Sequence, residues 1–280
     1  MGSKAKVWLD GPDGGLHLFK YVWHDGVGKV YGDDWAEKLA AELAGRLGVP
    51  AAEVDLARRG GEFGVICRRM NDPTVKELVH GNELLADSAT GYDPELKREH
   101  PLYTVDAVRA CLAGADAPAG HAGLQDLDGF QVWSGYLLLD AWIANTDRRH
   151  ENWGVLVDRR SGARRLAPSF DHGSSLGFNV PPTQMVDLLR DPVSLERWCG
   201  RGRSKHFAGR PALVQVAHEA LHRAGAQARR LWLSRLDGLD GDQWDGIIER
   251  VPGDRMSEDA RIFVGRVLEV NRRRLLDVRR

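Results

Sequence analysis

Two short segments in the second half of the chain carry side chains suited to phosphoryl transfer. In Asn145–Leu156, Asp147 is followed five residues later by Asn152. In Ser169–Leu176, Asp171 comes nineteen residues after Asn152 and is closely followed by a glycine. Phosphoryl transfer needs a carboxylate that orients the attacking hydroxyl and takes its proton, and oxygen ligands that hold Mg²⁺ against the β- and γ-phosphates of ATP. We therefore interpret Asp147 as the base, and Asn152 and Asp171 as Mg²⁺ ligands.

Each motif is weak alone, because Asp-x-x-x-x-Asn is common and Phe-Asp-x-Gly is often only a turn. Two upstream residues strengthen the interpretation. Lys20 lies on an otherwise aliphatic face of a predicted strand, and Glu37 follows seventeen residues later. An ion pair between them would aim the lysine at the α- and β-phosphates. The alternative is a capping box, with Asp34 as the helix N-cap and Glu37 reaching back to it; we favour the ion pair because it gives Lys20 a partner.

The elements that must position these residues follow from the hydrophobic periodicity. The first part predicts a hairpin over residues 6–23 around a turn at 11–15. A helix over 34–47 that ends at Gly48 comes next, and then a hairpin formed by 54–58 and 63–68 around Gly60-Gly61. From about residue 71 the pattern predicts mainly helices, over residues 74–86, 104–113, 127–145, 212–224, 227–236, 241–250 and 257–273.

This order predicts an α+β fold with two lobes and a cleft between them, where ligands commonly bind. We expect a small β-rich N-lobe over residues 1–70 and a larger helical C-lobe over residues 71–280, together forming one catalytic domain.

Composition argues against several classes of partner. The formal net charge is −1, which favours neither a nucleic-acid nor a membrane partner. The most apolar stretch, Tyr136–Ala144, is short and contains Asp140, so it predicts a buried helix and no membrane span. The arginines at 272–274, 279 and 280 are interpreted as a solvated helix end, with a phosphate- or partner-binding tail as the alternative.

The cysteines indicate the compartment. Cys67, Cys111 and Cys199 are odd in number and scattered, so they predict neither a disulfide framework nor a zinc site. The chain also opens without the apolar run of a secretory signal. We therefore expect a protein of a reducing cytoplasm.

The sequence resembles the HipA-like kinases, the bacterial branch of the protein-kinase-like and phosphoinositide-kinase-like superfamily. The matches run nearly from end to end, and the most specific are 147–154 and 170–176. The others are 2–8, 18–20, 32–38, 64–66, 80–85, 248–252 and 271–276.

The resemblance implies a two-lobed kinase that phosphorylates Ser or Thr of a protein. It implies Lys20 as the phosphate-binding lysine and residues 2–6, with Ser3 and Lys4, as the loop over the phosphates. The adenine is expected against backbone near the end of the N-lobe, at Cys67, Arg68, Arg69 and Met70. In the family a serine of the phosphate loop can be autophosphorylated, which ejects the loop, so Ser3 is expected to be an inhibitory site. The alternative is a frayed terminus.

Two departures from the family pattern affect these expectations. Family members usually carry His two residues after the catalytic Asp; here Arg149 stands there and His150 follows, so the role of the histidine is open. The chain also starts almost at the kinase core, so we do not expect the additional N-terminal domain of the toxin-type members. A toxin–antitoxin function is therefore not carried over.

Two other functions stay open. Antibiotic- and lipid-type kinases use the same Asp, Asn and Asp groups, so the acceptor could be a small hydroxyl compound. A catalytically inactive nucleotide-binding module is the other alternative. It is disfavoured because Lys20, Asp147, Asn152 and Asp171 are all present.

Overall fold

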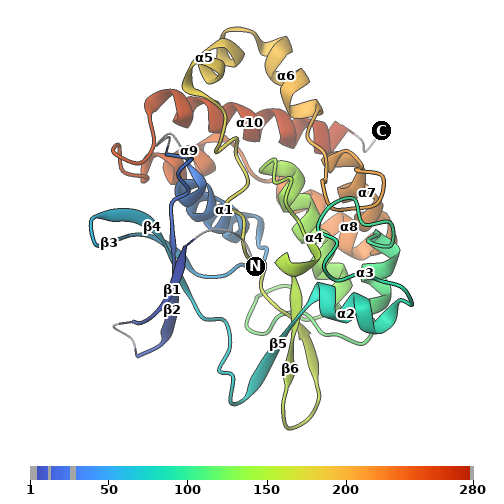
Figure 1. The fold of residues 1–280 in the computed structure, drawn as a ribbon. Helices are drawn as coiled ribbons and strands as arrows, with labels where there is room; N and C mark the ends of the chain where they lie inside the picture. Colours follow the sequence, from blue (N-terminus) through green and yellow to red (C-terminus); the bar gives the residue numbers. More distant parts are fainter. Residues whose placement is uncertain (1–4, 12–13, 26–29, 278–280) are drawn as a thin grey trace.

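The computed structural model describes residues 5–11, 14–25 and 30–277. Its first part is an antiparallel sheet of four strands in the order β1-β2-β4-β3. The strands are β1 (Lys6–Asp10), β2 (Leu16–Tyr21), β3 (Val54–Arg59) and β4 (Glu62–Arg68). Helix α1 (Asp33–Leu47) stands between the two hairpins in sequence, as predicted, and packs against β3 and β4 (Figure 1).

Glycines end the elements of this part where the sequence predicted. Gly48 caps α1 with a left-handed φ of 73°. Gly60 and Gly61 join β3 to β4 with φ values of 59° and 86°. Two successive residues with positive φ are typical of the tight turn that matches the twist of a two-residue hairpin.

A second antiparallel sheet lies in the other part of the molecule, in the order β5-β6-β7. It consists of β5 (Lys76–His80), β6 (Gly154–Asp158) and β7 (Arg164–Leu166). The helix predicted over residues 74–86 is therefore wrong in its first half. Pairing of Lys76 through His80 with β6 makes that half a strand, and α2 (Gly81–Ser88) begins only after it, where the Glu83 side chain accepts a hydrogen bond from the backbone of His80.

The other predicted helices are present within a few residues. They are α3 (Val105–Cys111), α4 (Gly129–Trp142), α7 (Leu213–Arg223), α8 (Ala226–Asp237), α9 (Gly241–Glu249) and α10 (Glu258–Asp277). Among the described residues, two α-helices were not predicted, α5 (Pro182–Arg190) and α6 (Pro192–Gly200). Each has only nine residues and opens with a proline, which favours the first turn of a helix but breaks a longer pattern.

The arrangement is a mixed fold with a small antiparallel sheet and a larger helical part, as expected. Helix α4 is its buried centre, since every residue of it except Gln131 is buried. Helix α1 also contacts α8 and α9, so it joins the four-stranded sheet to the helices (Figure 1). Among the described helices, none is long and apolar enough to span a bilayer.

Candidate active site

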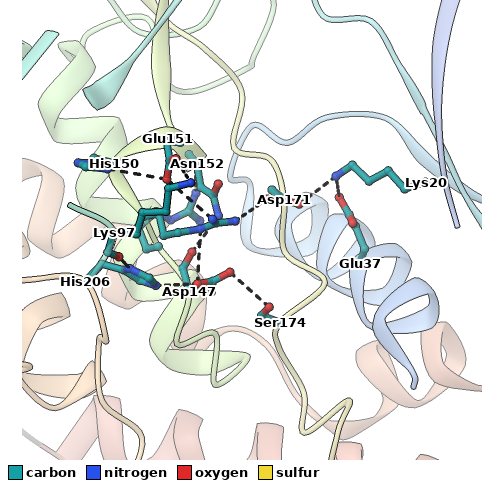
Figure 2. Close-up of polar contacts among 12 residues, drawn as sticks. Lys20, Glu37, Lys97, Asp147, His150, Glu151, Asn152, Asp171, Ser174 and His206 are labelled. Carbon is teal, nitrogen blue, oxygen red and sulfur yellow. Dashed lines mark hydrogen bonds and ion pairs between the residues drawn. The ribbon is translucent and has the colours of Figure 1, made fainter. Parts of the chain in front are cut away.

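Lys20 brings three distant segments together. Its Nζ lies 2.9 Å from Oε1 of Glu37 on α1 and 2.9 Å from Oδ1 of Asp171, in the loop after β7 (Figure 2). Burial alone would lower the pKa of Lys20, but the carboxylates of Asp171 and Glu37 outweigh it and hold the pKa well above its usual value. The lysine is therefore a fixed positive charge between two carboxylates.

The contacts of α1 decide between the two interpretations of Glu37. The residue before the helix is Gly32, so Asp34 is the second residue of the helix and not its N-cap. The Asp34 carboxylate instead forms an ion pair with Arg255. The capping alternative is therefore wrong, and the predicted Lys20–Glu37 ion pair is present.

The loop that carries Asp171 approaches α1 closely. Asp171 has a φ of 62°, a left-handed conformation that aspartate tolerates better than most residues. A Cβ on Gly173 would lie 2.9 Å from the carbonyl oxygen of Asp33 and 3.3 Å from Oε2 of Glu37. Glycine at 173 thus lets the loop reach the first turns of α1, which places Asp171 beside Lys20.

Asp147 lies between α4 and β6, and several groups hold it. Its Oδ1 is 2.6 Å from Nε2 of His206, and its Oδ2 is 3.4 Å from the Ser174 hydroxyl (Figure 2). Its backbone N–H donates to Oδ1 of Asn145 at 3.1 Å. Asn152 donates from Nδ2 to the carbonyl oxygen of Asp147 at 2.8 Å, so its side-chain nitrogen is committed to the loop.

A buried ion pair anchors this loop to the fold. The guanidinium of Arg148 contacts Asp140 of α4 through two hydrogen bonds of 2.7 and 2.8 Å. It also donates to the carbonyl oxygen of Asn152 at 2.7 Å and to the Ser169 hydroxyl at 3.0 Å. Burial would lower the pKa of Arg148, and the Asp140 carboxylate reverses that effect and raises it. One side chain therefore ties α4, the Asp147 loop and the start of the Asp171 loop together.

Arg149 lies among three carboxylates of the site. Its guanidinium nitrogens are 3.6 Å from Asp147, 3.8 Å from Glu151 and 3.7 Å from Asp171. These separations are longer than those of hydrogen-bonded ion pairs. Arg149 is thus a positive charge inside the acidic cluster, at the position where the resembling family carries histidine.

His150 lies at the edge of the acidic cluster, with Nε2 3.8 Å from the Glu151 carboxylate (Figure 2). It is buried, and its Nδ1 lies 2.6 Å from the hydroxyl of Tyr92. Burial lowers the pKa of His150 to about 4, so it is neutral at pH 7. His150 is therefore part of a packed aromatic group with Tyr92 and His100.

The residues expected around the adenine divide between two places. Cys67 of β4 lies close enough to the site for the charges of Glu37, Lys20 and Asp171 to act on its thiol, and burial, followed by the charge of Glu37, raises its pKa to about 12. Arg68, Arg69 and Met70 instead line a separate cavity of about 680 Å³. Among the described residues, its lining includes none of the five groups at Lys20, Glu37, Asp147, Asn152 and Asp171. Ser3 and Lys4 lie outside the residues that the structure describes.

Sequence reasoning missed three residues of the site. His206 comes from the segment between α6 and α7, and no local pattern marked it. Asp140 and Arg148 gave a weak signal, since a carboxylate inside the apolar stretch Tyr136–Ala144 needs a partner. Within the described part of the chain, no three His, Cys, Asp or Glu side chains cluster as a protein-only metal site.

Comparisons with known proteins bear on the fold. No protein-family model matches the sequence, and no curated protein matches it. The structure is similar to the crystal structure of the proinflammatory kinase CtkA of Helicobacter pylori, with a TM-score of 0.74 and 17% identity, over 98% of this chain and 92% of that chain. This chain has the fold of a kinase. The kinase fold implied by the resemblance is thus confirmed.

A chain of the Shewanella oneidensis MR-1 toxin–antitoxin complex of HipA, HipB and operator DNA also matches. Its TM-score is 0.47 and its identity 14%, over 99% of this chain and 66% of that chain.

Proposed function

We propose that this protein is an ATP- and Mg²⁺-dependent phosphotransferase that moves the γ-phosphoryl group of ATP to a hydroxyl. The observation that carries the proposal is the position of Lys20, 2.9 Å from both Glu37 and Asp171. A kinase needs such a pair to aim its lysine at the α- and β-phosphates beside a metal-binding carboxylate. The similarity of the fold to a kinase supports the same proposal.

Each side chain of the site has a proposed role. Lys20 binds the α- and β-phosphates, and Glu37 orients it. Asp147 orients the acceptor hydroxyl and takes its proton through Oδ2, the oxygen that already contacts a hydroxyl, that of Ser174. Backbone near Cys67 is proposed to bind the adenine, with Arg68, Arg69 and Met70 continuing the chain toward the second lobe.

The residues present fit a Mg²⁺ ion. Because Nδ2 of Asn152 donates to the backbone of Asp147, its Oδ1 is the atom left for a metal. Asp171 supplies a carboxylate, and Mg²⁺ in kinases takes one or two protein ligands together with phosphate oxygens and water. When bound, the ion would neutralise charge on the phosphates. Asn152 and Asp171 would hold it.

We favour a protein Ser or Thr as the acceptor, and a small hydroxyl compound is the alternative. The experiment is an ADP-release assay with Mg-ATP and three acceptor pools: a Ser/Thr peptide library, aminoglycosides and inositol lipids. Mass spectrometry then identifies the phosphorylated product. Phosphopeptides support the leading proposal, and phosphate only on a small molecule supports the alternative.

Controls separate an enzyme from an inactive module. Lys20→Met and Asp171→Asn should abolish product formation, and EDTA should do the same. A protein that binds ATP equally tightly in EDTA and in Mg²⁺, and forms no product with any pool, would contradict the proposal. Intact-mass and peptide analysis of the wild type after incubation with Mg-ATP also tests autophosphorylation at Ser3.

A further inference from the structure

His206 is a buried histidine in direct contact with the proposed base. Its side chain comes from the segment between α6 and α7, and the residue is 5% exposed. Nε2 lies 2.6 Å from Oδ1 of Asp147, and Nδ1 contacts the carbonyl oxygen of Lys97 (Figure 2). Both ring nitrogens therefore face oxygen atoms.

The backbone on both sides of His206 is held in place. The N–H of Lys205 donates to the carbonyl oxygen of Thr146, the residue before Asp147, at 3.3 Å. In the other direction, Glu99 and His100 donate to the carbonyl oxygens of Lys205 and His206, each at 3.0 Å. The imidazole is thus fixed relative to the loop that carries the base, and not only through its own side-chain contacts.

The partners of the ring define where its protons lie. A carbonyl oxygen only accepts hydrogen bonds, so Nδ1 carries a proton and donates it to Lys97. The contact between Nε2 and Oδ1 of Asp147 also needs one proton between the two atoms. For Asp147 to take the acceptor proton as the base, that proton must stay on Nε2. Oδ1 then accepts the hydrogen bond from His206, while Oδ2 lies 3.4 Å from the Ser174 hydroxyl.

We infer that His206 is a positioning residue for phosphoryl transfer, which fixes Asp147 so that Oδ2 meets the acceptor hydroxyl. The inference rests on the proposed function. In the step, the acceptor oxygen forms a bond to the γ-phosphorus while the bond from that phosphorus to the bridging oxygen of ADP breaks. The acceptor proton goes to Oδ2 of Asp147. His206 keeps its own proton beside Oδ1 throughout.

Arg149 makes this positioning necessary. Its Nε lies 3.6 Å from the same Oδ1 of Asp147, so it competes with His206 for that oxygen. Without the His206 contact, the carboxylate is free to turn toward the guanidinium. The acceptor-facing oxygen then moves, and a misplacement of about 1 Å in such a group costs about 10²-fold in rate.

Two substitutions separate positioning from a purely structural role. His206→Gln places an amide N–H near the position of Nε2 and loses the Nδ1 contact. His206→Asn places its amide N–H near Nδ1 and keeps the contact to Lys97, but loses the one to Asp147. The two variants are therefore matched, because each retains one of the two side-chain hydrogen bonds of His206.

The expected result is a difference in kcat with little change in the KM for ATP. His206→Gln should keep kcat within about tenfold of the wild type, while His206→Asn should lose about 10²-fold. Equal losses in both variants, or the reverse order, would overturn the inference. So would a loss that appears only in the KM for ATP.

Crystal structures of the two variants decide the question independently of activity. In His206→Asn we expect the Asp147 carboxylate to rotate toward Arg149, and in His206→Gln to keep its wild-type orientation. An unchanged Asp147 in His206→Asn would overturn the inference. A wild type without transferase activity would instead overturn the proposed function, and the orientation of Asp147 would still decide whether His206 positions it.

Discussion

Lys20 stands on a strand face that otherwise carries aliphatic side chains, and its two carboxylate partners account for its place there. Because Glu37 is only 3% exposed, the Lys20–Glu37 pair is largely shielded from water. Removing one partner of such a pair leaves the other charge uncompensated. The pair is therefore expected to act as a unit.

Substitution of either partner tests this coupling. Lys20→Met should weaken ATP binding by about tenfold or more, and Glu37→Gln should have a weaker effect in the same direction, because charge-assisted hydrogen bonds are worth about 1.5–3 kcal/mol. Calorimetric titration of each variant, and of the double variant, measures the effect. If Glu37→Gln changes only the melting temperature, the pair is structural and does not orient Lys20 for ATP.

Arg149 leads to a prediction about metal affinity. A guanidinium 3.6–3.8 Å from three carboxylates opposes the approach of another cation. Arg149→Gln should therefore tighten Mg²⁺ binding in the presence of nucleotide by about tenfold. This is a modest part of the Coulomb repulsion between a guanidinium and a cation that share the same carboxylates. A Mg²⁺ titration measures it, with Arg159→Gln, a half-exposed arginine paired with Glu77, as the control. Unchanged or weaker Mg²⁺ binding would show that Arg149 does not oppose the metal.

At the residue scale, patterns within short segments of the sequence were enough to single out some candidate site residues. Asp147 and Asn152 share one loop, and a strand-borne lysine without an obvious partner marks Lys20. His206 could not be predicted, because its partners are Asp147, 59 residues away, and a backbone carbonyl 109 residues away. Only the folded chain brings such groups together, and the hydrophobic periodicity of a sequence carries no information about contacts between distant segments.

The link between α4 and the Asp147 loop is a property of elements. Asp140 and Arg148 are both buried and each satisfies the other. Asp140→Ala should lower the free energy of unfolding by roughly 3–5 kcal/mol, because it leaves a buried guanidinium without its carboxylate. Urea denaturation measures the loss, and Asp87→Ala on the exposed side of α2 is the control. A loss no larger than that of the control would mean that the Arg148 contacts do not anchor the loop.

Long and strongly periodic elements were predictable, and short ones were not. The α1 stripe and the hairpin around Gly60-Gly61 give clear local signals. Strand β5 was misread as helix because its short apolar pattern fits both periods, and only pairing with β6 decides between them. Helices α5 and α6 are too short for periodicity to outweigh their prolines.

At the scale of the whole molecule, buried neutral histidines predict acid sensitivity. Burial lowers the pKa values of His100 and His150, that of His150 from 6.5 to about 4. Below pH 6.5, His150 of the unfolded chain binds a proton, whereas folded His150 stays neutral until the pH approaches 4. The contribution of neutral His150 to the free energy of unfolding is therefore fully present above pH 6.5 and falls as the pH drops toward 4. His150 alone should account for a loss of roughly 2 kcal/mol by pH 5.

Urea denaturation at several pH values between 7 and 5 measures this loss. Few carboxylates titrate in that range, so the slope reports mainly histidines. His150→Asn, which keeps a polar group near the Tyr92 hydroxyl, should flatten the slope. An unchanged slope would show that His150 is not the source of the acid sensitivity.

The central claim is that Asp147 is the base of a phosphotransferase, and turnover of Asp147→Asn with Mg-ATP and the identified acceptor tests it most directly. We predict that kcat falls by about 10²–10⁴-fold, the usual worth of general-base assistance, while the affinity for Mg-ATP stays within a few fold of the wild type. Turnover of Asp147→Asn at the wild-type rate would contradict the account.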